Sequence, residues 1–549
     1  MRMLPAFVFL AMYVHAAEPP IVITGPEQRQ IDMTLPDGGL PWYPGVSNIQ
    51  IFRASRVAPD LADGRGWTYH HHLDLGVWKG RMYCAWNSCE KDEDVWPSRE
   101  LYATSEDGVH WSEPKELFPL GLSAAQRMYF FHAPNGRMLA LAGGRDEKTH
   151  ERIANAMVVR EILADHTLGP VVHLLPDTKE LAGDPAFVEA CHQLLANKPF
   201  LEQADYGALL GERKMKWHDI NTWPATEPSR AEFPRRFGKA MCFYHRKDGA
   251  LVSVMKWGWV LVSRDEGETW SPPVRPPTLV AGMAKVWGQR TSDGRYALAY
   301  NPDLEKRWPL VVTTGDDGIT FNNMRVIFGE LPPMRYEGLY KVPGPQYVRG
   351  VSEWASDGSF KDDAMWIAYS VNKEDIWISR VPVGATLASP GLWNTYSSKW
   401  APVTAQKETL TLEDRDPSDY ARAVKLIEPS KHVEIAFDLT VEETNDSPLF
   451  VDLFGPHQSR VARVTIDPKT RVRGKALAMK ITADCAMKAI SATIDNQVIH
   501  LAPMADAKDI IAVSIQTGER AASIAAQDDH PIAPARYRVQ HFSVANQKS

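Results

Sequence analysis

The sequence is poor in cysteine and has no pattern of metal ligands. In a chain of 549 residues its five cysteines are Cys84, Cys89, Cys191, Cys242 and Cys485. This small, odd number excludes a disulfide framework, and the spacing does not match a structural zinc site. Cys84 and Cys89 could bridge across a bend, although buried free thiols fit the sequence equally well. No metal and no cofactor is therefore predicted.

Two further shortages narrow the class of protein. The formal net charge is −7 and no long basic run offsets it, which argues against nucleic acid as a partner. After the first residues, no stretch approaches the roughly 18 continuous apolar residues that a transmembrane helix requires. We therefore expect no membrane span. The hydrophobic content of 44% and the charged content of 23% are ordinary for a globular protein.

Residues 1–16 have the composition of a secretory signal peptide. Arg2 supplies a positive start, Leu4 to Val14 is mostly apolar, and Ala16 offers a small residue for cleavage. The apolar run is too short to span a membrane. We expect the mature chain to be secreted or periplasmic.

Turn-forming residues, by contrast, are abundant. The 40 prolines, 36 glycines and 18 tryptophans suit a β-rich fold. One pattern of hydroxyl, acid, glycine and aromatic residue occurs in Ser105–Trp111, Ser263–Trp270 and Thr314–Phe321. In a tight hairpin the acid accepts backbone N–H bonds, the glycine adopts positive φ, and the aromatic ring packs under the loop. We therefore interpret Asp107, Asp265 and Asp316 as turn residues rather than catalytic carboxylates.

At these residues the chain resembles the Asp-box (bacterial neuraminidase repeat) β-propellers, whose best-known members are the sialidases. In the families that carry it, the box lies on the outer part of a blade, away from the active site. The resemblance therefore implies a propeller architecture. Since the innermost strands of a propeller line its central channel, functional residues are expected on first strands and on the loops beside them.

Strand-prone runs separated by turn signals predict the blades. Five units are visible between residues 72 and 381, and N-terminal strands near Ile21–Thr24 and Ile49–Arg53 could complete a sixth. The sequence predicts an all-β fold with a six-bladed, alternatively seven-bladed, β-propeller over residues 17–385. The Ala-, Leu-, Glu- and Lys-rich segment 177–223 predicts a helical insertion between blades.

A second domain is predicted after a connector at 382–402 that is rich in Pro, Gly, Ser and Thr. Residues 400–549 contain alternating runs such as His432–Val441 and Ile510–Ile515. They predict a C-terminal β-sandwich of the jelly-roll or lectin-like type. Such a sandwich could bind carbohydrate, or it could serve as a spacer or packing unit.

Arginines are the candidate substrate-binding residues. Arg53 lies in Ile51–Ser55, which resembles the Phe-Arg-Ile-Pro segment of sialidases, where the arginine binds the substrate carboxylate; the Ile-Pro is missing here. Arg290 and Arg349 fall on predicted inner strands of consecutive blades. With Arg53 they could form a three-arginine clamp, because guanidinium donors match carboxylate oxygens. Arg145, after two glycines, is a fourth candidate.

Three consecutive histidines enter the first recognisable strand. Strand alternation would place His70 and His72 on one face and His71 on the other, so at least one should reach the channel. A neutral imidazole there can act as a general acid or base, which makes His71 and His72 candidate catalytic residues. They could equally be packed or hydrogen-bonded in the core. The run resembles the propeller polysaccharide lyases and rhamnose-releasing enzymes, where a channel histidine works beside tyrosine and arginine.

The resemblance to sialidases also implies a tyrosine nucleophile activated by a glutamate, because a neutral nucleophile avoids repulsion from an anionic substrate. Tyr336 and Tyr369 are the candidates for the tyrosine, with Glu337 and Glu353 as further candidate catalytic residues. The acidic loop Glu90–Asp94 lies near the place where a sialidase acid/base aspartate is expected, but it also fits a solvated connection.

These observations lead to three hypotheses, each with a carbohydrate partner. The first is a secreted sialidase-like glycoside hydrolase, an exo-glycosidase that acts on an acidic sugar in a glycan. The second is a propeller lyase or rhamnose-releasing enzyme that acts on a uronic-acid polysaccharide through a channel histidine. The third is a non-catalytic glycan-binding propeller.

Overall fold

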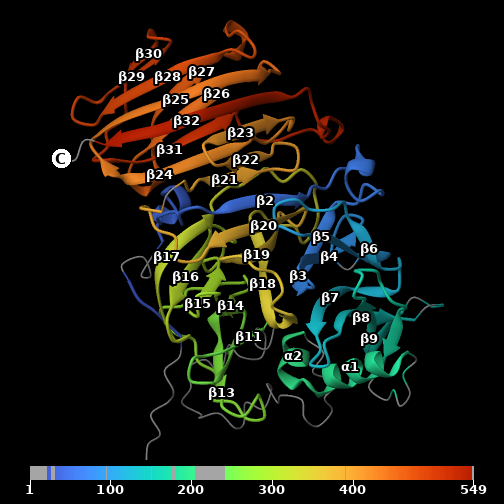
Figure 1. Ribbon diagram of the computed structural model, residues 1–549. Coiled ribbons are helices and arrows are strands. Elements are labelled where there is room, and N and C mark those ends of the chain that lie inside the picture. The colour runs from blue at the N-terminus through green and yellow to red at the C-terminus, as the bar shows by residue number, and fades with distance from the viewer. Residues whose placement is uncertain are drawn as a thin grey trace, which may run out of the picture.

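The computed structural model describes most of the chain, with gaps. The described residues are 21–25, 31–93, 95–146, 148–149, 151–175, 178, 181, 183–204, 241–389 and 391–546. They form a β-propeller and a C-terminal β-sandwich, which confirms the predicted fold class (Figure 1). The predicted signal peptide lies outside the described residues. Within the described ranges, no helix has both the length and the apolar character needed to cross a bilayer.

The described part of the propeller contains five blades, each built from consecutive antiparallel strands. First strands of neighbouring blades contact one another, so they are the inner strands of the ring. The first two blades comprise β3 (Tyr69–Trp78), β4 (Arg81–Cys89), β5 (Ser98–Ser105) and β6 (Lys115–Phe118), then β7 (Ser123–His132), β8 (Met138–Arg145), β9 (Arg152–Ile162) and β10 (Val172–Leu174). The other three comprise β11 (Cys242–His245), β12 (Leu251–Val254) and β13 (Val260–Ser263), then β14 (Trp287–Arg290), β15 (Tyr296–Tyr300), β16 (Leu310–Gly315) and β17 (Thr320–Phe328), and last β18 (Pro345–Ser356), β19 (Ala364–Val371) and β20 (Asp375–Pro382).

The N-terminal strands complete two of these blades. β1 (Val22–Ile23) pairs in parallel with β17, and β2 (Ser47–Phe52) pairs antiparallel with β20. Each becomes the outermost strand of its blade, because the last strand there otherwise leaves backbone groups unpaired. The prediction that these two strands build a sixth blade is therefore wrong. Residues 205–240, between the second and third blades, fall outside the described part, so the six-bladed count itself stays a prediction.

The first Asp box forms the expected turn after the third strand of its blade. The Asp107 carboxylate accepts the N–H groups two and three residues ahead, both at 2.8 Å. The Trp111 indole N–H donates to the carbonyl of Gly108 at 2.8 Å. Gly108 has a φ of +75°, and a Cβ at this position would come within 2.1 Å of Trp366. Only glycine fits both requirements.

The second and third boxes differ in which aspartate accepts the backbone N–H groups of the turn. Asp265 accepts the N–H of Thr269 at 2.8 Å, as predicted. In the third box Asp317 accepts the two N–H groups ahead of it at 2.7 and 2.8 Å. The acid's role in the turn is confirmed for Asp107 and Asp265. In the third box Asp317 takes this role in place of Asp316, which lies in the same turn.

Two helices follow the second blade, α1 (Pro185–Ala196) and α2 (Lys198–Gln203). The Asp184 carboxylate caps α1 by accepting the N–H groups of Ala186 and Phe187 at 2.9 and 3.1 Å. Their apolar faces pack on the second blade in a common core. The predicted helical insertion is confirmed as far as residue 204, and its remainder lies outside the described residues.

The sandwich packs two sheets face to face. One contains β21 (Asn394–Ser397), β24 (Arg422–Ser430), β31 (Ile510–Thr517), β26 (Leu449–Phe454) and β27 (Arg460–Ile466). The other contains β22 (Val403–Gln406), β23 (Thr409–Asp414), β32 (Ala535–Asn546), β25 (His432–Glu443), β28 (Ala476–Asp484), β29 (Ala489–Ile494) and β30 (Gln497–Pro503). Inward residues alternate along β25, as the period-two pattern predicted, and fill one apolar core.

The sandwich and the propeller share a sheet. β21 pairs in parallel with β2, which is also the outer strand of the last blade. The resulting sheet of 13 strands runs from the sandwich through the last blade to the first (Figure 1). Backbone hydrogen bonds therefore join the two domains directly.

All five cysteines are buried and free. Cys84 and Cys89 both belong to β4, so of the two alternatives left open by the sequence, the free thiols are the correct one.

Candidate functional site

A group of polar and charged side chains gathers at the end of the propeller where the inner strands begin. They come from the loops that enter the inner strands and from the turns between second and third strands. The members are His71, His72, Glu93, Lys256, Lys285, Arg307, Tyr347 and Lys373. We call this group the charged site. Cations outnumber carboxylates in it, so it favours an anionic ligand.

Tyr347, near the start of β18, is the centre of the charged site. The ammonium of Lys256 donates to its phenolic oxygen at 3.0 Å. The Nζ of Lys285 lies 4.3 Å from the ring centroid, and the guanidinium carbon of Arg307 lies 5.6 Å from it. Tyr347 adopts a positive φ of 54°, and such strained residues cluster at functional sites. Cations placed in this way would stabilise negative charge on the phenol or on a bound ligand.

His71 and His72 lie side by side against Tyr347. Their ring centroids are 4.7 Å apart, and they lie 4.1 and 5.0 Å from the Tyr347 ring. A bulge in β3, with a φ of 51° at His72, breaks the strand alternation. The prediction that His70 and His72 share a face is therefore wrong. The Nε2 of His70 instead lies 2.9 Å from the carbonyl oxygen of Trp67.

Both histidines of the charged site are neutral near pH 7. Burial, helped by neighbouring positive groups, lowers the pKa of His71 well below its usual value. Its Nδ1 lies 2.5 Å from the hydroxyl of Ser370. Burial also lowers the pKa of His72 to about 4, although Glu93 opposes this shift. His71 is fully buried while the His72 side chain keeps 11% exposure, so His72 is the better placed of the two to exchange protons with a ligand.

Glu93 links His72 to the cations. Its Oε1 lies 3.2 Å from Nε2 of His72, and its Oε2 accepts from Lys373 at 2.9 Å. Burial alone would raise the pKa of Glu93, but His72 and Lys373 hold it below its ordinary value. A carboxylate at Nε2 orients the imidazole ring. Glu93 belongs to the acidic loop of the sequence analysis, in which Asp92 instead accepts the backbone N–H of Tyr340 at 3.1 Å.

Arg349 lies further along β18, among the inner strands. It is 1% exposed, its Nη2 donates to the Tyr129 hydroxyl at 2.9 Å, and its guanidinium carbon lies 5.3 Å from the Trp287 ring. Burial raises the pKa of Asp74 to about 7, and both Arg349 and Lys285 oppose that shift. Of the predicted arginines, Arg349 is the one on the strand that carries Tyr347, two residues further along, and its role in binding stays a prediction.

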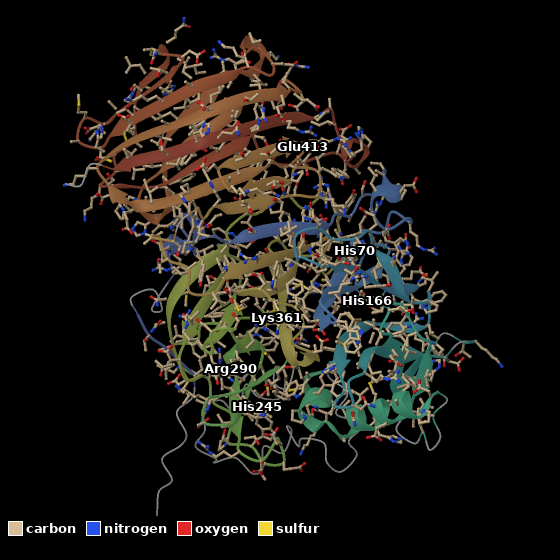
Figure 2. The ribbon with its side chains drawn as sticks, viewed as in Figure 1. His70, His166, His245, Arg290, Lys361 and Glu413 are labelled. Atoms are coloured by element: carbon tan, nitrogen blue, oxygen red, sulfur yellow. The ribbon has the colours of Figure 1, made fainter. Side chains whose placement is uncertain are left out.

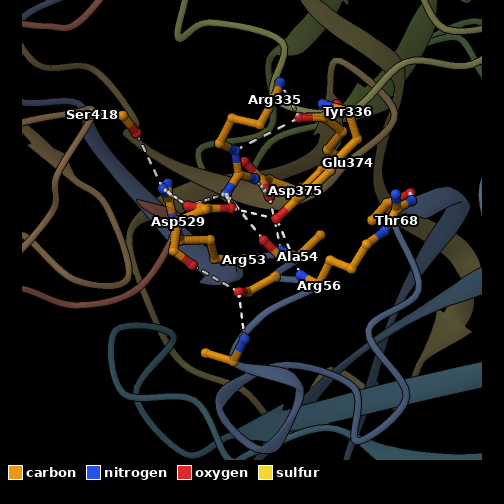
Figure 3. Close-up of polar contacts among 12 residues, drawn as sticks. Arg53, Ala54, Arg56, Thr68, Arg335, Tyr336, Glu374, Asp375, Ser418 and Asp529 are labelled. Carbon is orange, nitrogen blue, oxygen red and sulfur yellow. Dashed lines mark hydrogen bonds and ion pairs between the residues drawn. The ribbon is translucent and has the colours of Figure 1, made fainter. Parts of the chain in front are cut away.

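The three-arginine clamp does not form. Arg53 is buried against the sandwich, with guanidinium nitrogens 3.2 Å from Asp416 and 2.6 Å from Asp529 (Figure 3). Arg290 is exposed at the far end of the four-residue strand β14, well away from His70 (Figure 2). The predicted convergence is wrong for both, because the chain after β2 turns toward the sandwich and Arg290 ends its strand rather than beginning it.

The two predicted nucleophiles are also outside the charged site. The Tyr336 hydroxyl donates to Asp529 at 2.5 Å in the interface with the sandwich, and burial raises the pKa of Tyr336 to about 12. The Tyr369 hydroxyl lies 2.9 Å from that of Ser379 in an apolar core. Tyr369 belongs to β19, a second strand, so it does not face the propeller axis.

Glu353 and Arg145 lie in other surroundings. Glu353 comes six residues after Tyr347 on an extended strand, or about 20 Å further along, and contacts His245 Nδ1 at 2.8 Å. The prediction that Glu353 serves the same site is wrong for this reason. The carbonyl of Arg145, at the end of β8, lies 3.2 Å from His173 Nε2 within the second blade. Its role in substrate binding stays a prediction.

The sequence analysis missed Tyr347, Lys256, Lys285 and Arg307. Tyr347 lies on the first strand of the last predicted unit, so the expectation that inner strands supply the site could have selected it. Lys256 comes from a loop of the third blade, and Lys285 and Arg307 come from loops of the fourth. Nothing in their local sequence distinguishes them from other loop lysines and arginines, and only the ring closure brings them together.

Comparisons with known proteins agree with this architecture. Residues 20–124 match the family model described as BT_1020-like, N-terminal β-propeller, and residues 393–530 match the one described as sialidase-like, CBM domain. A solved structure titled "Sialidase" superimposes with a TM-score of 0.79 at 28% identity, covering 96% of this chain and 54% of that one. The chain has a sialidase-like fold. It spans about half the length of that structure.

Other solved structures are less similar. A Trypanosoma rangeli sialidase, solved as a covalent intermediate with 2,3-difluorosialic acid, is 10% identical over 93% of this chain and 97% of that one, with a TM-score of 0.34. An alginate lyase of polysaccharide lyase family 7, AlgAT5, is 9% identical over 27% of this chain and 83% of that one, with a TM-score of 0.19. Neither superposition is close enough to support an argument. No curated protein matches the sequence.

Proposed function

We propose that this protein is a sialidase-like glycoside hydrolase that releases an acidic sugar from a glycan at the charged site. The observation that carries the proposal is the convergence of Lys256, Lys285 and Arg307 on Tyr347. A sugar carboxylate bound there would face several cations, one of them within hydrogen-bond reach of the phenol. The sialidase-like fold of both domains supports the same class of substrate.

In this proposal Tyr347 is the nucleophile. Its phenolic oxygen forms a bond to the anomeric carbon while the glycosidic C–O bond breaks. Neutral His72, oriented by Glu93, takes the phenolic proton and passes it to the leaving oxygen. Water then hydrolyses the tyrosyl–sugar bond. Lys256 stabilises negative charge on the phenolic oxygen in both steps. In the sialidase pattern a glutamate activates the tyrosine instead, by acting as its base.

The remaining cations select the substrate. Lys285 and Arg307 lie beside the Tyr347 ring, where they would bind the carboxylate of an acidic sugar. Lysine acts as a point charge, whereas arginine fixes a carboxylate through two parallel hydrogen bonds. A site in which lysines replace most of the arginines should therefore recognise the negative charge of the sugar with less dependence on its exact orientation.

The test compares Tyr347→Phe with Tyr369→Phe on fluorogenic glycosides of sialic and uronic acids. Tyr369 is the matched control, because it is a buried tyrosine of the same propeller whose hydroxyl lies outside the charged site. Loss of the nucleophile should lower kcat/KM by at least about a thousandfold, while the control stays within roughly twofold. Full activity in Tyr347→Phe, or no release of any acidic sugar by the wild type, refutes the proposal.

One observation favours the lyase as a second candidate. His72 and Tyr347 lie with their rings 5.0 Å apart beside Lys285 and Arg307. If the substrate is a uronate polymer, His72 could abstract the proton next to the carboxylate while Tyr347 protonates the leaving oxygen. Elimination leaves an unsaturated uronate that absorbs in the ultraviolet, whereas hydrolysis does not, so one absorbance measurement on uronic-acid polysaccharides separates the two reactions.

A further inference from the structure

The last loop of the sandwich reaches into the propeller. Asp529, between β31 and β32, is fully buried. Its carboxylate accepts from Arg53 at 2.6 Å, from Arg335 at 3.1 Å and from the Tyr336 hydroxyl at 2.5 Å (Figure 3). Its carbonyl accepts from the hydroxyl of Ser55 at 2.9 Å. A single sandwich residue thus bonds to several side chains of the propeller.

Arg335 continues this network toward the turn between β19 and β20. Its Nη2 donates to the carboxylate of Asp375, and its Nε lies 3.7 Å from that of Glu374. Glu374 in return accepts the backbone N–H groups of Arg335 and Tyr336 at 3.1 and 2.8 Å. The position of Arg335 therefore fixes both carboxylates, and Asp529 is one of the groups that fixes Arg335 (Figure 3).

The residues just before these carboxylates serve the charged site. Lys373 donates to Glu93 at 2.9 Å, and its carbonyl accepts the N–H of His70 at 2.9 Å. Ser370, near the end of β19, lies 2.5 Å from Nδ1 of His71. The segment 370–375 thus contacts the sandwich network through its last two residues and the charged site through Ser370 and Lys373.

The backbone of this turn needs support from outside. Asn372 and Lys373 have φ values of 58° and 57°. Asparagine adopts this conformation readily, whereas a lysine keeps it only when its surroundings hold it. If Glu374 and Asp375 moved, the strain at Lys373 could relax. The ammonium of Lys373 would then leave Glu93, and His72 would lose its oriented partner.

We propose that Asp529 is a positioning residue for the charged site and acts through Arg335 on the 370–375 turn. Buried ion pairs add little net stability, because desolvation offsets their attraction. The network is therefore better explained by the side-chain geometry that it fixes than by the stability that it adds. The inference rests on the proposed function, and it gives the sandwich a part in the reaction other than carbohydrate binding. Asp529 itself does not touch the substrate.

The test measures hydrogen exchange of the 369–376 amides by mass spectrometry in Asp529→Asn, with Asp452→Asn as the control. Asp452 is also a buried sandwich aspartate, bonded to Arg463 at 2.6 and 2.7 Å, but it lies outside this network. Loss of a charge-assisted hydrogen bond should quicken exchange in Asp529→Asn by at least about tenfold. The control should leave the segment unchanged. Equal exchange in the two variants overturns the proposal.

A milder variant covers the case in which Asp529→Asn does not fold. Tyr336→Phe removes the phenolic bond to Asp529, and with it the bond that the hydroxyl accepts from the N–H of Arg56 at 3.1 Å. It leaves the Asp529 carboxylate and its two arginine partners in place, and should quicken exchange of the same amides by roughly threefold or more. If these amides exchange in Tyr336→Phe at the same rate as in the wild type, the proposal is overturned.

Kinetics give the second readout. Asp529→Asn should lower kcat more than it raises KM, because Lys373 and His72 act on bond breaking rather than on holding the sugar. A change in KM alone argues against positioning. Exchange is measured without substrate, so a wild type that lacks hydrolase activity would refute the proposed function, and the exchange result would still decide the role of Asp529.

Discussion

Acid should destabilise the folded protein through His72. Its pKa is about 4 in the folded state, against an ordinary value of 6.5. Between these values the unfolded chain takes up a proton that the folded protein does not. Proton uptake stabilises the unfolded chain, so it lowers the free energy of unfolding. This loss is absent above pH 6.5, grows as the pH falls, and is complete below pH 4. At about 1.4 kcal/mol per pH unit, the gap between these two pKa values is worth roughly 3 kcal/mol.

The perturbation that isolates this effect is His72→Asn. Asparagine tolerates the positive φ of 51° at this position better than most residues, and it does not titrate. At pH 7 the variant should melt below the wild type, because it loses the ring contacts with His71 and Tyr347. At pH 4.5 only the wild type loses free energy of unfolding through this residue, by roughly 2–3 kcal/mol. The difference in melting temperature should therefore shrink or change sign.

Calorimetry of both proteins at pH 7 and 4.5 measures this change. One kcal/mol shifts the melting temperature of a domain of 150–250 residues by roughly 2–4 °C, so a change of several degrees is expected. His541→Asn is the matched control, because His541 has a φ of 52° but is exposed, and its bond to Asp438 raises its pKa. For this control, the difference in melting temperature between wild type and variant should stay the same or widen at pH 4.5, because protonated His541 stabilises the folded wild type. An unchanged difference for His72→Asn refutes the claim that His72 is held neutral.

Lys285→Met removes a cation 4.3 Å from the Tyr347 ring, so it should raise KM for an acidic substrate by at least about tenfold and affect KM for a neutral analogue less. Steady-state kinetics on the two substrates check this. Gly108→Ala should lower the melting temperature by several degrees, because its Cβ would come within 2.1 Å of Trp366, while kcat at 25 °C stays as in the wild type. Asp317→Asn should lower the free energy of unfolding by about 1 kcal/mol more than Asp316→Asn does, since only Asp317 accepts the turn amides; urea titration of both variants decides.

The fold could be predicted because its signals are local. An Asp box holds its acid, glycine and aromatic ring within a few residues, so Asp107 and Trp111 show the turn directly in the sequence. Alternation along β25 is equally local and reports the buried face of the sandwich. The strands β1 and β2 could not be assigned, because pairing with β17 and β20 joins parts of the chain that lie far apart in the sequence.

The candidate site was harder to predict, since it depends on local irregularities and on ring closure. Simple alternation would place His71 and His72 on opposite faces of β3, but the bulge at His72 brings both to the same site. Lys256, Lys285 and Arg307 become neighbours only when the third and fourth blades pack beside the last blade, which carries Tyr347. Arg53 stands in a segment that resembles a substrate-binding one, but here the sandwich supplies Asp529 as its counterion.

The shared sheet has a practical consequence for dividing the protein. β2 is hydrogen-bonded to the last blade along one side and to β21 along the other. A chain shortened after residue 385 would keep every described propeller strand, yet it would present β2 as an open edge. Open edges recruit strands from other molecules. Expression of the propeller alone should therefore yield aggregates or domain-swapped species, and material for crystals or assays is best made with both domains in one polypeptide.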